Sequence, residues 1–313
     1  MKNKMVVLIP ALSPDDKMLS LIKDIDFADI VIVNDGSDNH FNFIFDNAKE
    51  LGATILKHNK NMGKGAALKT GFEYIIKHYP KDTYICCADC DGQHKSADIL
   101  KCLNACKENK NCLILGSRCF SKKDIPLRSR LGNKLTRSIF NMLCGIKVAD
   151  TQTGLRALST STAKLFLNVK GDRFEYEMNM LIETKPLSIN IIEVPIQTLY
   201  IEENKSSHFN PFLDSLRIYK VLMKFIVSSI ISFLIDISLF FLVANFFPFS
   251  KAENIIYATL ISRIISSFAN YFINRKKVFY SKNKSSILKY YILAAIQLII
   301  SGISVSLLAH FTP

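Results

Sequence analysis

The stretch Tyr84–His94, YICCADCDGQH, joins an apolar run to two carboxylates that a single residue separates. Tyr84–Ala88 has the length and composition of a buried strand. Asp89 and Asp91 follow at its end, and Gly92 favours a tight turn there. Carboxylate oxygens at such a place can hold Mg²⁺ or Mn²⁺, and either cation can bridge phosphate oxygens. The alternative is an ordinary turn, because Asp and Gly are common turn residues.

Around this stretch, short apolar runs alternate with amphipathic segments. This rhythm predicts an α/β domain, in which helices cover a mainly parallel sheet. Ligands of such sheets bind beyond the carboxyl ends of the strands, where Asp35 and the Asp89/Asp91 pair are expected. We expect the other strands at Val6–Ile9, Ile30–Val33, Thr54–Leu56 and Cys112–Leu115, and helices at Ala66–Tyr79 and Ala97–Glu108.

The composition changes after Lys224, where three nearly uncharged stretches begin. Each has about 20 residues, enough to cross a hydrocarbon core of about 30 Å as a helix. A buried core is the alternative, but three such stretches in a row rarely fit inside a soluble domain. We therefore expect an α/β domain over residues 1–219 and an all-α membrane domain over residues 220–313, with spans at 225–247, 255–273 and 290–309.

The totals agree with a membrane protein. The 313 residues carry a formal net charge of +13, and 49% of them are hydrophobic. A nucleic-acid binder would explain the charge alone, whereas a membrane protein with a basic cytoplasmic face explains both values. We therefore expect a lipid bilayer and no nucleic acid among the partners, and the membrane domain leaves self-association open.

The loops between the spans predict the orientation. Lys220 and Lys224 precede the first span, and six basic residues lie in the link 274–289 between the second and third. Positively charged loops stay in the cytoplasm, so we expect a multi-pass protein of the cell membrane with its N-terminal domain in the cytoplasm. Asp236 and Arg263 fall inside spans, where they could pair, snorkel or serve transport.

The cysteines favour the same compartment. All eight lie between Cys86 and Cys144, several in apolar surroundings. Cys87 and Cys90 have C-x-x-C spacing, but the second pair that a zinc site needs is missing. Reduced thiols in the core of a cytosolic domain are the preferred interpretation.

Three further motifs end at the same edge of the expected sheet. Asp35, at the end of a strand, could accept the N–H of a nucleobase. Lys64 lies between two glycines at a helix start, where a phosphate can approach the backbone. Arg118 ends the next strand and could face a diphosphate. Each is an ordinary turn or loop residue when taken alone, but the ordered set is what a nucleotide-sugar site requires.

These motifs resemble glycosyltransferase family 2. The resemblance is carried by VNDGSDN (33–39), NMGKGAALKTG (61–71), ADCDGQH (88–94), GSR (116–118) and DTQTGLRAL (150–158). Within the family it is greatest to the dolichyl-phosphate mannose synthase and polyprenyl-phosphate glycosyltransferase branch. It implies a GT-A (Rossmann-like) fold, a nucleotide-diphosphate sugar donor and a divalent metal, Mg²⁺ or Mn²⁺. NYFINRKKVF (270–279) resembles GtrA-like membrane domains.

The resemblance also implies roles for single residues. Asp89 and Asp91 match the metal-binding pair, and Gln93 matches a further metal contact. The implied donor-binding residues are Pro10, Asp35, Lys64, Asp89, Asp91, Arg118 and Lys205, the last in a loop that closes over the phosphates. The implied contacts to a lipid phosphate are Arg128, Arg130, Lys134 and Ser207.

Two departures from the family pattern stand out. Leu12 occupies a position where the family usually has tyrosine in the donor site, and Asp15 or Asp16 would have to replace a nearby glutamate. GtrA-like domains usually have four spans, whereas the sequence predicts three. Residues 127–146 read as a basic amphipathic helix suited to the membrane interface, with packing on its own sheet as the alternative.

The expected reaction is inverting transfer of the sugar to polyprenyl (undecaprenyl or dolichyl) phosphate. A UDP-sugar is the favoured donor and GDP-mannose the alternative. Because the attacking phosphate is already ionised, Asp150 is expected to orient groups rather than to act as a base. The competitors are transfer to another lipid or polysaccharide acceptor and a non-catalytic carrier of lipid-linked sugar. The chain has no Trp for the Q-x-x-R-W motif of processive synthases.

Overall fold

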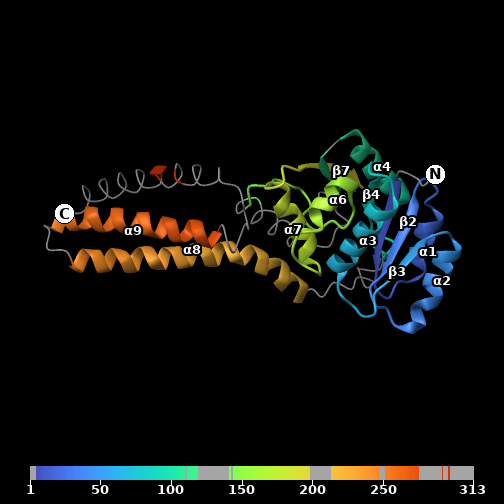
Figure 1. Cartoon of the computed structure of the whole chain (residues 1–313), viewed down its shortest axis with the longest axis horizontal. Coiled ribbons are helices and arrows are strands. Elements are labelled where there is room, and N and C mark those ends of the chain that lie inside the picture. Colours follow the sequence, from blue (N-terminus) through green and yellow to red (C-terminus); the bar gives the residue numbers. More distant parts are fainter. Residues whose placement is uncertain are drawn as a thin grey trace. The chain divides into compact units, whose positions relative to one another are not determined.

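The computed structural model describes residues 5–109, 111–118, 141, 144–197, 213–246, 251–274, 291 and 295–296. The chain divides into two compact units, Met1–Tyr219 and Lys220–Pro313. The first unit is a twisted sheet with helices on both faces, and the second is helical (Figure 1).

The sheet has seven strands in the order β3-β2-β1-β4-β6-β5-β7. All neighbouring pairs are parallel except those that involve β6, which runs antiparallel between β4 and β5. This confirms the expected mainly parallel α/β architecture. The strands are β1 (Met5–Ala11), β2 (Asp29–Asn34), β3 (Thr54–Lys57), β4 (Tyr84–Cys87), β5 (Cys112–Arg118), β6 (Arg156–Ser159) and β7 (Asn190–Ile196).

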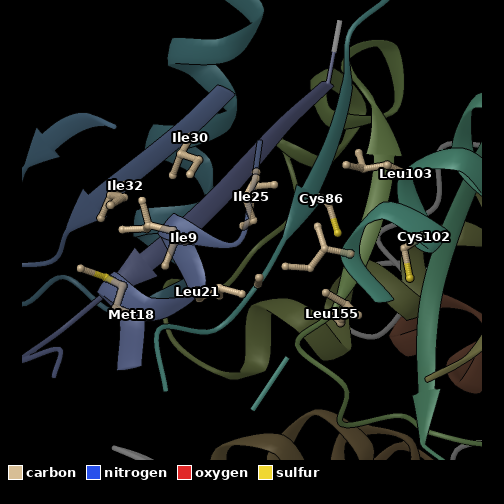
Figure 2. Packing of buried hydrophobic residues seen from close by; sticks show 14 of the residues in the cluster. Ile9, Met18, Leu21, Ile25, Ile30, Ile32, Cys86, Cys102, Leu103 and Leu155 are labelled. Carbon is tan, nitrogen blue, oxygen red and sulfur yellow. The ribbon is translucent and has the colours of Figure 1, made fainter. Parts of the chain in front are cut away.

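Helices cover both faces of the sheet, as the continuous burial of β1 and β2 requires. On one face, alternate β-strand residues pack against the apolar sides of the first, second and fourth helices (Figure 2). On the other, the third helix packs on β1 and β2, close enough for Gly71 to lie against Leu8. The helices of this unit are α1 (Asp16–Lys23), α2 (Asn42–Glu50), α3 (Lys64–His78), α4 (Ser96–Glu108), α6 (Thr160–Phe166) and α7 (Glu175–Thr184), with a 3-10 turn η1 (Asn39–Phe41).

The described cysteines are free thiols. Burial raises the pKa of Cys87 and of Cys102 to about 12, so both thiols are protonated at neutral pH. Cys86, Cys102 and Cys106 belong to the apolar core between the sheet and α4. Within the described part of the chain, these thiols are core residues rather than a metal centre.

The second unit contains two long described helices, α8 (Leu213–Phe246) and α9 (Lys251–Ile273). Among the helices that are described, α8 is the one long and apolar enough to cross a membrane, over Ile226–Phe246 with a mean hydropathy of 2.4. That segment lies within the expected span 225–247, and α9 contains the expected span 255–273. The third expected span, 290–309, falls almost wholly outside the described residues.

The two charges inside the expected spans pair with each other. Arg263 Nε lies 3.4 Å from Asp236 Oδ2, and Ser266 donates a 3.0 Å hydrogen bond to Asp236 Oδ1. Both contacts connect α8 with α9. Of the alternatives that the sequence left open, the structure shows the ion pair, which compensates two charges that would each be costly in an apolar span.

Candidate active site

The candidate site lies at one edge of the sheet. β1, β2 and β4 are mutually parallel, and β5 runs in the same direction, because β6 is antiparallel to both β4 and β5. Their carboxyl ends therefore meet at this edge, and β6 begins there, since Arg156 pairs with Cys87 at the end of β4. The edge gathers the Asp89/Asp91 turn, Asp35, Arg118 and the loop 150–155. Pro10 lies near it in β1, paired with Val33 and buried.

Asp35 holds the loop that leads into α3. Its Oδ1 accepts a 2.9 Å hydrogen bond from the Met62 amide and lies 2.7 Å from His58 Nδ1, while its Oδ2 accepts a 2.8 Å bond from the Gly63 amide. Gly63 has a φ of +105°, a backbone conformation that favours glycine. Three internal contacts thus occupy this buried carboxylate, and its contact with a nucleobase stays a prediction.

Lys64, the first residue of α3, joins two carboxylates. Its Nζ lies 2.7 Å from Asp89 Oδ1 and 2.9 Å from Glu177 Oε2. Burial by itself lowers the pKa of Lys64, but Asp89 and Glu177 outweigh that effect and raise it overall. For Asp89 the directions are reversed: burial by itself raises the pKa, but Lys64 and His94 outweigh that effect and lower it overall. Lys64 is therefore an ammonium and Asp89 a carboxylate at neutral pH.

Asp91 completes the acidic pair. Its Oδ1 accepts a 3.1 Å hydrogen bond from the Gln93 amide, which fixes the turn after β4. Burial raises the pKa of Asp91, and repulsion from the charge of Asp89 raises it further. A divalent cation between them would relieve that repulsion.

The oxygen donors of this turn fit Mg²⁺ or Mn²⁺. No three His, Cys, Asp or Glu side chains are grouped as metal ligands within the described residues. A cation at Asp89 and Asp91 would therefore take its remaining ligands from Gln93, water or bound phosphates. Mg²⁺ sites in nucleotide-binding proteins are usually built this way, from one or two carboxylates and substrate phosphates.

Gly154 packs directly against Asp89. A Cβ atom added to Gly154 would collide with both carboxylate oxygens of Asp89. Because Gly154 has no side chain, the loop before β6 leaves room for the Asp89 carboxylate. His94 also lies near this carboxylate, with Nε2 3.6 Å from Asp89 Oδ2.

Arg118 and Asp150 form a two-point ion pair. Arg118 donates from Nε and Nη2 to the two carboxylate oxygens of Asp150, at 2.5 Å and 3.0 Å. Asp150 is fully buried, and the Ala149 amide donates to Glu193 Oε1 at 2.8 Å. Glu193 of β7 thus holds the loop, and Asp150 fixes the plane of the guanidinium. The expected orienting role of Asp150 is consistent with this geometry.

The structure brings together two of the predicted sets, Lys64 with Asp89 and Arg118 with Asp150. Asp35, Asp91, Gln93 and Pro10 lie at or near the same edge. Some predicted positions lie outside the described residues: Lys205 of the donor loop, the lipid-phosphate contacts Arg128, Arg130, Lys134 and Ser207, and most of the amphipathic helix 127–146. Asp15 caps α1 by accepting from the Lys17 amide at 3.0 Å.

Sequence reasoning missed the residues that support the site from a distance. Glu177 and Glu193 carry no motif signal, because a single Glu on a helix or strand looks like a solvated residue. His94 ends the ADCDGQH motif, but the motif does not indicate that its ring lies beside Asp89. Gly154 lies within the DTQTGLRAL motif, where a glycine just before a strand start is the available signal. None of these contacts follows from spacing along the chain.

An acidic pair beside a lysine, at the carboxyl edge of a mainly parallel sheet, is typical of α/β proteins that bind their ligands at that edge. Residues 17–166 match the family model described as glycosyl transferase family 2, and residues 222–313 match that described as GtrA/DPMS, transmembrane domain. The chain belongs to glycosyltransferase family 2 and carries a GtrA/DPMS transmembrane domain. As the motifs led us to expect, it is therefore an enzyme of the hexosyltransferase class.

Two relatives from archaea illustrate the similarity. An uncharacterised protein of Methanocaldococcus jannaschii is 32% identical over 236 residues, which cover 73% of this chain and 93% of that protein. The UDP-N-acetylglucosamine–dolichyl-phosphate N-acetylglucosaminyltransferase of Methanococcus voltae is 30% identical over 250 residues, which cover 71% and 97%. Among solved structures, mannosyl-3-phosphoglycerate synthase from Rubrobacter xylanophilus aligns with a TM-score of 0.53 at 13% identity, covering 71% of this chain and 72% of that one. This last likeness concerns the fold alone.

Proposed function

We propose that the protein transfers a sugar from a nucleotide-diphosphate sugar to polyprenyl phosphate at a membrane surface. The observation that carries the proposal is the Asp89/Asp91 pair with Lys64 2.7 Å from Asp89, in a family 2 domain on the same chain as a GtrA/DPMS membrane domain. A sugar donor suits the first unit, and a lipid acceptor suits a transferase that carries its own membrane domain.

The donor diphosphate would lie over the carboxyl edge of the sheet. Asp89 and Asp91, with Gln93, would hold Mg²⁺ or Mn²⁺, which supplies positive charge against the diphosphate when bound. Arg118, with its guanidinium plane fixed by Asp150, would stabilise the charge that grows on the leaving group. Lys64 would contribute a second cation from the start of α3.

The acceptor needs little activation. An oxygen of polyprenyl phosphate attacks the anomeric carbon, the bond from that carbon to the diphosphate oxygen breaks, and the nucleoside diphosphate leaves. A phosphate monoester is already ionised at neutral pH, so no proton has to be removed from the nucleophile. Attack opposite the leaving group inverts the anomeric carbon.

A UDP-sugar is our preferred donor, and the Methanococcus voltae relative supports it, because its name specifies UDP-N-acetylglucosamine and dolichyl phosphate. The test uses purified full-length protein with a panel of labelled UDP-, GDP- and other nucleotide sugars and a short-chain polyprenyl phosphate. We expect label from one of the UDP-sugars to enter the organic phase only when Mg²⁺ or Mn²⁺ and the lipid are present. Absence of labelled lipid with every donor would refute the proposal.

Gly154 gives a prediction about the acidic pair. Because the Cβ atom of alanine would occupy the space of the Asp89 carboxylate, Gly154→Ala should displace that side chain without breaking the fold. We expect transfer activity to fall by about a hundredfold, as when a reacting group is misplaced by about 1 Å. Thermal melting of Gly154→Ala beside wild type monitors its folding. Activity near wild type in Gly154→Ala would contradict the placement of Asp89.

The proposed topology places the N-terminal domain in the cytoplasm, because Lys220 and Lys224 precede the first span and six basic residues lie in the link 274–289. Protease added to sealed, right-side-out cells should leave this domain intact, and the same protease should degrade it after the membrane is permeabilised. Digestion in sealed cells would reverse the orientation.

A further inference from the structure

Lys64 is shared by two carboxylates that come from different elements. Asp89 lies in the turn after β4, and Glu177 lies in the first turn of α7. The three side chains are largely withdrawn from solvent, with exposed fractions of 14% for Lys64, 31% for Asp89 and 11% for Glu177. The ammonium is thus a fixed counter-ion rather than a surface charge.

This arrangement conflicts with a cation bound to Asp89. The ammonium already lies 2.7 Å from Asp89 Oδ1. A divalent cation bound to the same oxygen would therefore lie close to the ammonium, and the two positive charges would repel each other strongly in this partly buried site. A cation that binds Asp89 through Oδ1 must therefore displace Lys64 Nζ. Because Lys64 is charged at neutral pH, it needs another negative partner when it moves.

Glu177 is built to be that partner. Its Oε2 already contacts Lys64 at 2.9 Å, and Arg156 lies on its other side, with Nε 3.8 Å from Oε1 and Nη1 donating to the Glu177 carbonyl at 2.6 Å. Arg156 is itself buried in β6, so it holds Glu177 in place. The Phe174 ring, 5.8 Å from Lys64 Nζ, adds a further favourable surface for the ammonium on this side.

We propose that Lys64 holds the place of the divalent cation at Asp89, and that Glu177 is the positioning residue that retains Lys64 when the cation arrives. Two consequences follow. Lys64 competes with the metal for Asp89. In the absence of the metal, the ammonium compensates the charge of the acidic pair. Glu177 makes the exchange favourable by leaving the displaced ammonium paired and close to the donor phosphates. This inference rests on the proposed metal-dependent transfer.

The competing explanation is that Glu177 only adds negative charge near the metal. The two explanations differ in one respect. If Glu177 acts through Lys64, its effect on metal affinity requires Lys64, whereas a direct effect of its charge persists when Lys64 is replaced by a neutral residue. A double-mutant cycle separates the two.

The experiment measures Mn²⁺ binding to the full-length protein in detergent, by electron paramagnetic resonance of the free ion, without donor or lipid. The variants are Lys64→Gln, Glu177→Gln and the double variant. Asp91→Asn identifies the site. Glu175→Gln is the matched control, because it removes a charge from the same turn of α7, and its Oε1 accepts from backbone amides of the preceding loop. Thermal melting without metal monitors folding in each case.

We expect Lys64→Gln to bind Mn²⁺ about tenfold more tightly and Glu177→Gln about tenfold more weakly, as the loss of one partly buried charge interaction implies. When Lys64→Gln is already present, adding Glu177→Gln should change the dissociation constant by less than about threefold. Glu175→Gln should bind Mn²⁺ within about twofold of wild type. Should Lys64→Gln fail to fold, the double variant, which loses one charge of each sign, must still bind Mn²⁺ more tightly than Glu177→Gln.

An equal weakening by Glu177→Gln with and without Lys64→Gln would overturn the proposal, and so would unchanged or weaker binding after loss of Lys64. These outcomes are distinct from failure of the proposed function. In that case the wild type and Asp91→Asn would bind Mn²⁺ equally, and no metal-dependent transfer would be found.

Discussion

Replacing Asp91 with Asn should reduce sugar transfer by at least about two orders of magnitude, the scale on which electrostatic stabilisation of a transition state acts. Asp91 is the half of the acidic pair that Lys64 does not neutralise, so its charge is the main attraction for a divalent cation. Asparagine keeps an oxygen that can accept the hydrogen bond from the Gln93 amide. The turn after β4 should therefore keep its shape while the site loses its metal.

The measurement is the rate of label transfer to lipid, with circular dichroism and thermal melting to show that the variant folds. Asp172→Asn is the matched control, since Asp172 is an exposed residue paired with Lys69 at 3.1 Å. Chelator should remove wild-type activity, and added Mn²⁺ or Mg²⁺ should restore it. Full activity of Asp91→Asn, or of wild type in excess chelator, is incompatible with the metal assignment.

Replacing Asp150 with Asn should lower kcat by about a hundredfold with a smaller change in KM, because a misoriented catalytic group costs this much. Asparagine offers Arg118 one acceptor where aspartate offers two, so the two-point pair is lost and the guanidinium turns. The orienting role predicts that the loss depends on Arg118.

A double-mutant cycle with Arg118→Lys tests that dependence. When Arg118→Lys is already present, adding Asp150→Asn should cost less than about threefold, because lysine cannot use a bidentate partner. A general base would behave differently, since its loss would cost the same factor with arginine or lysine at this position and would flatten the dependence of kcat on pH. Either of those results would assign Asp150 to proton transfer.

Much of this fold was predictable because its strands are buried on both faces. Ile30–Val33 and Tyr84–Ala88 are continuous apolar runs, which strands of a parallel sheet require, and each is followed by a turn with a carboxylate. The positions of Asp35, Asp89 and Arg118 at one edge follow from that topology. Family motifs then supplied the order of the site along the chain.

The antiparallel strand β6 could not be found in this way. It has only four residues, Arg156–Ser159, and begins with a charged side chain, so it has neither a long apolar run nor alternation. Arg156 is buried because it donates to the carbonyls of Thr153 and Glu177, contacts that exist only in the folded domain. β6 nevertheless brings the loop 150–155 to the edge where Asp89 lies.

The contacts within the site were also beyond the reach of the sequence. Lys64 and Glu177 lie far apart along the chain, and no pattern specifies that they meet. Asp35, for which contact with a nucleobase stays a prediction, also accepts hydrogen bonds from the amides of Met62 and Gly63. Such internal use of a motif residue depends on how a loop folds back, which local propensities do not determine.

The leaving group distinguishes transfer of a sugar from transfer of a sugar phosphate. Purified protein is incubated with the preferred nucleotide sugar, polyprenyl phosphate and Mn²⁺, and both products are analysed by mass spectrometry. We expect equal amounts of nucleoside diphosphate and a lipid that carries one phosphate and one sugar. Release of nucleoside monophosphate with a lipid diphosphate sugar, or sugar transfer that does not require the lipid, would contradict the proposed reaction.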